Sequence, residues 1–246
     1  MHQHIIIIGS SYLQGKRIAW HYSDKEISKD ILSMLNEKTK SLLGRPNYSV
    51  HKMSTLSKEW TSVVEKDSFF EDFYIYTDLD VFLQEILIDK KISALDIAKY
   101  LLSIQPMSNL KLQKIIYLVY ADYLLRTQKP LFSDKIIAFQ YGPVVRDVYN
   151  YYKGHGRDDI EEGKENEHLL ILDEITIPVT LAKILQSDEQ ESVLLSIKSV
   201  LEKFGAMSAN QLVYMTHKSG SPWDRTSPQG IITDKLILKY HNIEIA

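Results

Sequence analysis

The stretch from Gly9 to Arg17 is the first place where residue types and spacing suggest chemistry. Gly9, Gly15 and Lys16 follow a β-branched run, as the glycines and lysine of a phosphate-binding loop follow a strand. Such a loop needs four residues between the glycines, a Ser or Thr after the lysine to bind magnesium, and a helix next. Here five residues intervene, Arg17 follows the lysine, and residues 18–22 read as a strand. The pattern therefore favours a hairpin turn over a nucleotide site.

Four histidines in the first ninety residues could supply imidazole ligands for a zinc ion: His2, His4, His21 and His51. His2 and His4 are two residues apart, so their rings would share one face of a strand. No carboxylate pattern completes the site, and His2 lies at the chain terminus. We therefore expect surface or interfacial histidines, with no metal and no cofactor.

A third set of reactive residue types lies near His217, which precedes a loop carrying Ser219, Ser221 and Asp224. A serine, a histidine and a carboxylate could form an acid–base set, but the ordered spacing of a nucleophile elbow is missing. His217 more simply ends a helix, where a donor meets free carbonyl groups, and Trp223 fills the neighbouring core. The sequence therefore predicts no catalytic residues and no enzymatic activity.

Composition excludes several further classes of site. The 246 residues are 44% hydrophobic and 25% charged, the balance of a globular protein, and the absence of cysteine excludes disulfides and thiolate chemistry. The net charge of −3 is spread evenly, so neither half has the basic excess that drives nucleic-acid binding. The run of four isoleucines near the start is too short for a membrane span. We expect a cytoplasmic protein with no membrane partner.

The first ninety residues alternate strand-like and helix-like segments. Strands are expected at residues 4–9, 16–22, 48–54 and 72–77, and helices after the capping patterns at 23–26 and 77–80, the first ending near 43–46 and the second spanning 79–87. This order, ββαβ(α)βα, predicts a small α/β unit with helices on at least one face of its sheet.

From residue 91 the pattern becomes mostly helical, which predicts an α+β chain with domains at 1–90 and 91–246. A capping pattern at 93–96 starts a helix, residues 110–127 form a central helix with an apolar stripe, and residues 136–140 read as a strand. Gly142 and Pro143 suit a helix start, residues 154–168 a solvated loop, and residues 192–204 and 208–217 two more helices. Residues 219–230 form a structured loop with two prolines.

Tyrosines concentrate in this second part, where eight of the fifteen fall between Tyr100 and Tyr152. Tyr117, Tyr120 and Tyr123 cannot all face the same way on one helix, so we expect some of them near the surface. Exposed tyrosines are favoured at protein interfaces, although they could equally form the edges of the core. Base stacking on such a surface would lack the accompanying basic groove.

Several motifs of the second part, in order, resemble the Panacea domain of SocA-like antitoxins over about residues 91–240. They are Lys111-Leu-Gln-Lys-Ile-Ile-Tyr117, Lys129-Pro-Leu-Phe132, residues 136–139, Tyr141-Gly-Pro-Val144, Val148-Tyr149, His217 and Ser221-Pro222-Trp223. The chain departs from the family pattern at Ala121-Asp122, where a glycine and an aromatic residue are usual, and at Arg146, where a proline is usual.

The resemblance implies a mostly helical domain, often borne by phages or prophages, that neutralises a cognate toxin by direct protein binding. The N-terminal domain would then help to select or dock the toxin. The expected contact residues are Tyr117, Tyr120, Tyr123, Tyr141, Tyr149, Tyr151, Tyr152, His217 and Trp223. Two other functions stay open: a DNA-binding autoregulator or phage regulatory protein, and an adaptor that delivers a partner to a protease.

Overall fold

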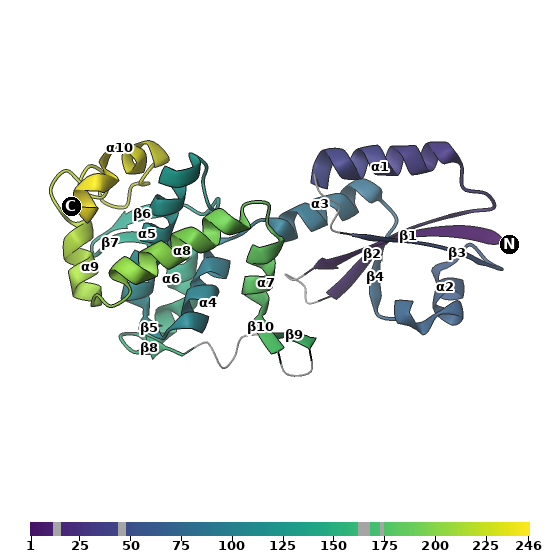
Figure 1. Cartoon of the computed structure of the whole chain (residues 1–246), viewed down its shortest axis with the longest axis horizontal. Helices are drawn as coiled ribbons and strands as arrows, with labels where there is room; N and C mark the ends of the chain where they lie inside the picture. The colour runs from purple at the N-terminus through teal and green to yellow at the C-terminus, as the bar shows by residue number, and fades with distance from the viewer. Residues whose placement is uncertain (12–15, 44–47, 162–167, 173–174) are drawn as a thin grey trace. The chain divides into compact units, whose positions relative to one another are not determined.

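The isoleucine run forms the inner strand of a four-stranded sheet (Figure 1). The computed structural model describes every residue except 12–15, 44–47, 162–167 and 173–174. The strands are β1 (His2–Ser11), β2 (Lys16–Asp24), β3 (Ser49–Thr55) and β4 (Phe73–Tyr76), in the order β3-β1-β2-β4. β1 pairs antiparallel with β2 and β3, while β4 is parallel to β2. The β1–β2 pairing confirms a hairpin where the phosphate loop was considered, although residues 12–15 themselves lie outside the described part.

Helices cover both faces of this sheet, and the prediction of helices on at least one face is confirmed. α1 (Lys29–Leu43) and α3 (Leu79–Lys90) pack on the face that carries Ile5 and Ile7, as Figure 1 shows. α2 (Trp60–Lys66) and the short helix η1 (Ser68–Phe70) cover the opposite face around Ile6. Because both faces are buried, β1 can be apolar at successive positions instead of alternating.

One predicted helix start and one predicted helix cap in this unit are wrong. Ser23 lies in β2, where its hydroxyl donates to the carbonyl of Lys58, and α1 begins only at Lys29. At α3 the capping residue is Asp78, because its carboxylate accepts from the amides of Asp80 and Val81, at 2.8 and 3.1 Å. The predicted start of the second helix at Leu79 is confirmed, whereas its predicted cap at Thr77 is not. The predicted end of α1 near 43–46 falls partly on residues 44–47, which lie outside the described part.

The chain forms two compact units, Met1–Lys91 and Ile92–Ala246. Each has a core of its own, and the overall fold is α+β. No helix in the described part of either unit is long and apolar enough to cross a membrane.

In the second unit the helices pack around α5 (Asn109–Thr127), as Figure 1 shows; its residues 112–121 are all buried, while Leu125 and Arg126 near its end are exposed. The other helices are α4 (Ala94–Ile104), α6 (Arg146–Tyr152), η2 (Lys153–His155), α7 (Val179–Gln186), α8 (Gln190–Phe204), α9 (Ala209–Thr216) and α10 (Asp234–Ile245). Short strand pairs join β5 (Met107–Ser108) to β8 (Asp159–Ile160), β6 (Ile136–Phe139) to β7 (Gly142–Val145), and β9 (His168–Leu172) to β10 (Ile175–Pro178). The capping boxes predicted at Ser93 and Ser208 are present.

Three expectations for this unit need correction. Gly142 and Pro143 do not start a helix: they lie in β7, opposite Phe139 and Ala138, and α6 begins at Arg146. The described residues of 154–168 are not a loop throughout, because the end of η2 and the whole of β8 lie among them, while residues 162–167 lie outside the described part. The helix predicted at 208–217 was expected to be the last one, but α10 follows the loop at 219–230. Its hydrophobic residues form no clear stripe, because buried polar groups share its inner face.

Candidate protein-binding site

The β6–β7 hairpin rests on a buried lysine. The Lys114 side chain, on α5, is 0% exposed, and its Nζ donates to the carbonyl of Pro143 at 2.8 Å. Gly142 beside it has φ +100°, a conformation that glycine adopts readily. A Cβ atom at this position would lie 2.9 Å from both Lys114 Nζ and Thr216 Oγ1. Position 142 therefore requires glycine for two reasons: its backbone conformation and the lack of space for a Cβ atom beside the lysine.

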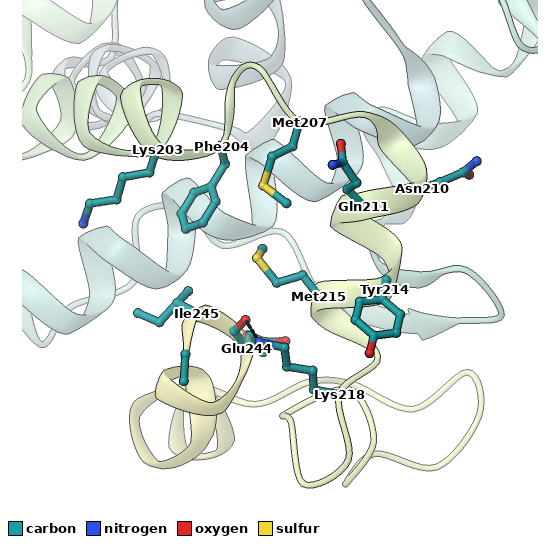
Figure 2. A pocket seen from close by; sticks show the side chains of 11 residues that line it. Lys203, Phe204, Met207, Asn210, Gln211, Tyr214, Met215, Lys218, Glu244 and Ile245 are labelled. Carbon is teal, nitrogen blue, oxygen red and sulfur yellow. Dashed lines mark hydrogen bonds between the residues drawn. The ribbon is translucent and has the colours of Figure 1, made fainter.

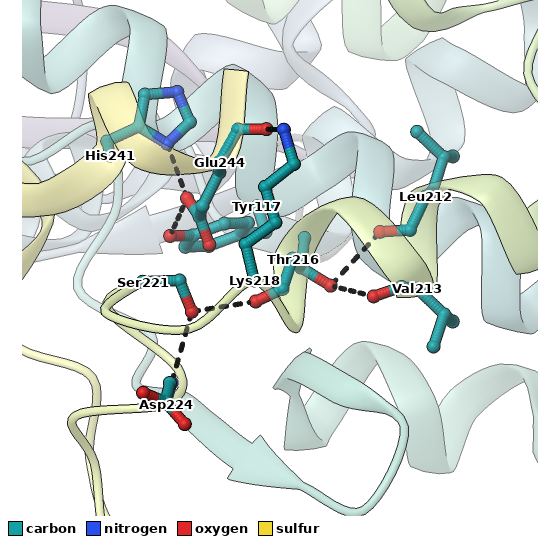
Figure 3. Close-up of polar contacts among 9 residues, drawn as sticks. All are labelled: Tyr117, Leu212, Val213, Thr216, Lys218, Ser221, Asp224, His241 and Glu244. Carbon is teal, nitrogen blue, oxygen red and sulfur yellow. Dashed lines mark hydrogen bonds and ion pairs between the residues drawn. The ribbon is translucent and has the colours of Figure 1, made fainter. Parts of the chain in front are cut away.

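A second buried group, the Glu244 carboxylate on α10, ties that helix to α5. Its Oε2 accepts a hydrogen bond from the Tyr117 hydroxyl at 2.7 Å and lies 2.6 Å from His241 Nδ1 (Figure 3). Tyr117 and Glu244 are both 0% exposed. Lys218 Nζ donates to the Glu244 carbonyl at 3.2 Å. A buried carboxylate without such donors would be strongly destabilising, so this network fixes where α10 lies.

Burial shifts the proton affinities of this network in opposite directions. It lowers the pKa of Lys114 to about 7, although the charge of Glu244 acts to raise it. Burial, with the neighbouring Glu244, raises the pKa of Tyr117 well above its usual value. Tyr117 therefore keeps its proton and remains a donor, and the ammonium charge of Lys114 is held only weakly.

The histidine, serine and aspartate considered as an acid–base set are not assembled for catalysis. The Ser221 hydroxyl donates to the carbonyl of Thr216 at 2.9 Å and accepts from the Asp224 amide (Figure 3). His217 instead packs against Trp223, with ring centroids 3.7 Å apart. Burial and the nearby charge of Lys114 lower the pKa of His217. These groups hold the loop together, as the simpler interpretation expected.

The outer side of the hairpin carries the exposed side chains of Tyr141, Arg146 and Tyr149 together with the partly buried ring of Phe139, a group here called the hairpin patch. Tyr141 is 60% exposed and Tyr149 39%. The Tyr149 ring meets Phe139 edge to face at 5.8 Å, and the Arg146 guanidinium lies 5.9 Å from the Phe139 ring centre. From below, Trp223 Nε1 donates to the Phe139 carbonyl at 2.8 Å. The patch is thus an exposed surface on a rigid base.

An apolar groove of about 530 Å³ lies where α8, α9 and α10 meet (Figure 2). Phe204, Met207, Met215 and Ile245 supply most of its apolar lining. Tyr214 stands on the α9 side with 78% of its side chain exposed. We name this feature the α8–α10 groove.

Comparison with known proteins finds a family match within the second unit. The family model described as "Antitoxin SocA-like, Panacea domain" matches residues 112–224. This segment, called the Panacea domain below, is thus similar to that family. A curated relative, "Antitoxin SocA" of Caulobacter vibrioides (strain NA1000 / CB15N), is 32% identical over 139 residues. That alignment covers 56% of this chain and 65% of the relative, slightly less than two thirds of its length. No solved structure matches the chain.

Four of the seven tyrosines expected as contacts are buried in the Panacea domain. They are Tyr117, Tyr120, Tyr123 and Tyr152, each 5% exposed or less. The expectation that some tyrosines of the central helix reach the surface is wrong for Tyr117, Tyr120 and Tyr123, because neighbouring elements cover α5 around these positions. Tyr120 is even satisfied internally, since its hydroxyl donates to Asp234 at 2.7 Å. None of these four offers its ring to a partner in this conformation.

The remaining expected residues divide by exposure. Tyr141, Tyr149 and Tyr151 reach the surface, and Lys99 lies 5.4 Å from the Tyr151 ring centre. His217 and Trp223 are partly buried and support the hairpin from within the Panacea domain. The domain therefore presents Tyr141 and Tyr149 in one patch, with Tyr151 beside α4.

The four N-terminal histidines do not form a metal site in the described part of the chain. His4 is buried, and its Nδ1 lies 2.8 Å from His21 Nε2, with the two rings stacked. His4 Nε2 is 2.8 Å from Thr55 Oγ1. Both rings thus act as packing and hydrogen-bonding groups beneath α2.

Sequence reasoning missed the α8–α10 groove entirely. Its walls come from Phe204, Met207 and Tyr214, which lie beyond the tyrosine-rich block and before α10. The available signal was the exposed Tyr214 next to the apolar Met215 on α9. It could not be interpreted without knowing that α10 closes the other side.

Proposed function

We propose that this chain is an antitoxin that neutralises a cognate toxin protein by binding it directly. The observation that carries the proposal is the match of residues 112–224 to the SocA-like Panacea domain, together with the similarity to the curated antitoxin. The fold alone would not carry it, since function resides in sites rather than in folds.

The exposed surface supports binding as the mode of action. Tyrosine and arginine are the residues most enriched at the energetic centres of protein interfaces, and the hairpin patch combines Tyr141, Tyr149 and Arg146. The Tyr149 ring and the Arg146 guanidinium already lie against Phe139 in the free chain, so these two side chains lose little freedom on binding. The groups that could have done chemistry are engaged in holding the loop instead. We propose that neutralisation needs no catalytic step.

The first unit lies outside the matched segment, and we propose that it helps to select the toxin. Its sheet ends in β3 and β4, whose outer edges pair with no other strand in the described part. Val50 and Tyr74 on these edge strands are more than half exposed. An exposed edge strand can accept a partner segment through backbone hydrogen bonds.

Co-expression with the adjacent gene tests the proposal. The product of that gene should arrest growth when expressed alone, and this protein should restore growth and co-purify with it at a fixed ratio. Toxin abundance, followed by immunoblot, separates direct blocking from delivery to a protease: direct blocking leaves the amount of toxin unchanged. A neighbour that is harmless alone, or that stays toxic beside this protein, would rule the proposal out.

A double variant tests whether the hairpin patch contacts the toxin. Tyr141→Ala combined with Arg146→Glu should weaken binding of the toxin by roughly tenfold or more, because both are exposed members of the hairpin patch. Tyr74→Ala, a comparable loss of an exposed tyrosine in the other unit, reports whether the edge strand contributes as well.

A further inference from the structure

The α8–α10 groove has the surface chemistry of a binding site rather than of an ordinary exposed face. Met207 and Met215 face each other across it, with Phe204 between α8 and α9 and Tyr214 beside them (Figure 2). Methionine adapts its shape to apolar partners and its sulfur packs well on aromatic rings. The volume of the groove, about 530 Å³, lies within the range of sites that enclose ligands or several side chains.

Two of the polar side chains that line the groove, Gln211 and Glu244, are engaged within the fold. Gln211 Oε1 accepts from the Ser208 amide in the α9 capping box. The Glu244 carboxylate is turned inward to Tyr117 and His241. A cofactor site would need several convergent polar groups free to orient a small molecule, whereas this lining offers mainly apolar contact.

Two ammonium groups give the groove its electrostatic character. Lys203 and Lys218 are the charged side chains of the described lining that reach solvent, since Glu244 is 0% exposed. Neither lysine pairs with an acidic side chain in the described part of the chain, and Lys218 is held in place by the Glu244 carbonyl. An apolar floor flanked by positive charge complements a segment that is apolar and acidic.

We propose that the α8–α10 groove receives a segment of the toxin that presents adjacent apolar side chains flanked by an Asp or Glu. This rests on the proposed function and extends it, because the groove lies on α8, α9 and α10 rather than on the hairpin patch. The apolar side chains fill the space between Met207 and Met215, and the carboxylate pairs with Lys203 or Lys218. The toxin is then held at two separate surfaces of the same unit.

The experiment compares the binding of the purified full-length chain and its variants to the product of the adjacent gene. Tyr214→Ala with Lys203→Glu removes one wall and reverses one charge at exposed positions, so the fold should persist. Calorimetry should show affinity reduced roughly tenfold or more. The matched control is Leu195→Ala with Lys198→Glu, which makes the same kinds of change elsewhere on α8. A peptide array tiling the toxin should show binding to apolar, acidic segments that falls with added salt.

The possible outcomes separate a failure of the groove inference from a failure of the proposed antitoxin function. If the natural chain binds the toxin and the groove variant binds it within twofold of the control, the groove inference is overturned and the antitoxin proposal stands. If the natural chain does not bind the toxin at all, both are overturned. A natural chain that is dimeric in solution, and that the groove variant alone makes monomeric, would assign the groove to a second copy and also overturn the inference.

Discussion

Because a buried ammonium group lies beneath a tight turn, adding or removing a single atom near Lys114 should change the stability of the fold. Lys114 Nζ donates to a carbonyl and has no ion pair with a carboxylate in the described part, so its charge is poorly compensated. The positive φ of Gly142 places the turn directly on this group. Small changes here should therefore have large effects on stability, and the hairpin patch depends on the same turn.

Gly142→Ala should lower the free energy of unfolding by about 2 kcal/mol or more, because it combines an unfavourable φ with contacts of 2.9 Å. Urea denaturation followed by circular dichroism measures the loss. Gly154→Ala is the matched control: no atom lies within 4 Å of a Cβ there, so its effect should stay within about 0.5 kcal/mol. Equal urea midpoints for the two variants would contradict the strained geometry at Gly142.

Tyr117→Phe removes one hydroxyl and leaves the Glu244 carboxylate short of a donor. The expected loss of stability is about 1–3 kcal/mol, typical of leaving a buried acceptor unsatisfied. Hydrogen exchange should show the loss first in the amides of α10, which this bond ties to α5. Tyr214→Phe removes the same atom from an exposed ring and should change neither measurement. Unchanged exchange in α10 after Tyr117→Phe would mean that other contacts, such as the bond from Tyr120 to Asp234, hold the helix in place.

Local sequence patterns predict where the helices of this chain lie better than they predict which of its residues are buried. The capping boxes at Ser93 and Ser208 could be identified from sequence because they are formed within four residues. The burial of the α5 tyrosines could not, since it depends on elements that approach from distant parts of the chain. The pair Gly142–Pro143 shows the same limit: its residues suit a helix start, yet pairing with β6 places them in a strand.

The same division holds for the candidate site. The exposure of Tyr141 could be predicted, because a turn must reach the surface, whereas nothing in the sequence separated Tyr149 on α6 from the buried Tyr152 of the same helix. The bond between Tyr117 and Glu244 joins positions 127 residues apart, and the α8–α10 groove needs three helices at once. No spacing along the chain signals either of them.

The first sheet contains a histidine pair that should make its stability depend on pH. Burial, with the charge of His4, lowers the pKa of His21 to about 4, and burial lowers that of His4. The unfolded chain therefore binds protons between pH 6.5 and 4 that the folded chain does not, so stability is lost as pH falls through this range. Hydrogen exchange of the β1 and β2 amides at pH 7 and pH 5 measures the effect. His21→Gln should reduce this dependence; if the variant keeps it in full, other groups are responsible.

At the scale of the whole molecule, the distribution of charge bears on which kind of partner the chain takes. The net charge is −3, and the two parts divided at residue 90 are each slightly acidic. The cations found at the candidate surfaces, Arg146, Lys203 and Lys218, are few and lie beside aromatic or apolar side chains. This combination suits a protein surface more than a polyphosphate, because phosphate binding relies on many cations acting together.

Duplex DNA binding separates the antitoxin proposal from the autoregulator alternative. Fluorescence anisotropy with a labelled duplex from the region upstream of the gene should show no saturable binding at low micromolar protein at 50 mM salt. The toxin should still bind under the same conditions, and with only modest loss at 200 mM salt, since its interface is largely apolar. A DNA-binding protein that neutralised six to ten phosphates would instead lose affinity by roughly 10³–10⁵ over that range of salt. Tight, salt-sensitive binding to the duplex would show that the even charge conceals a basic surface, and would favour the regulator.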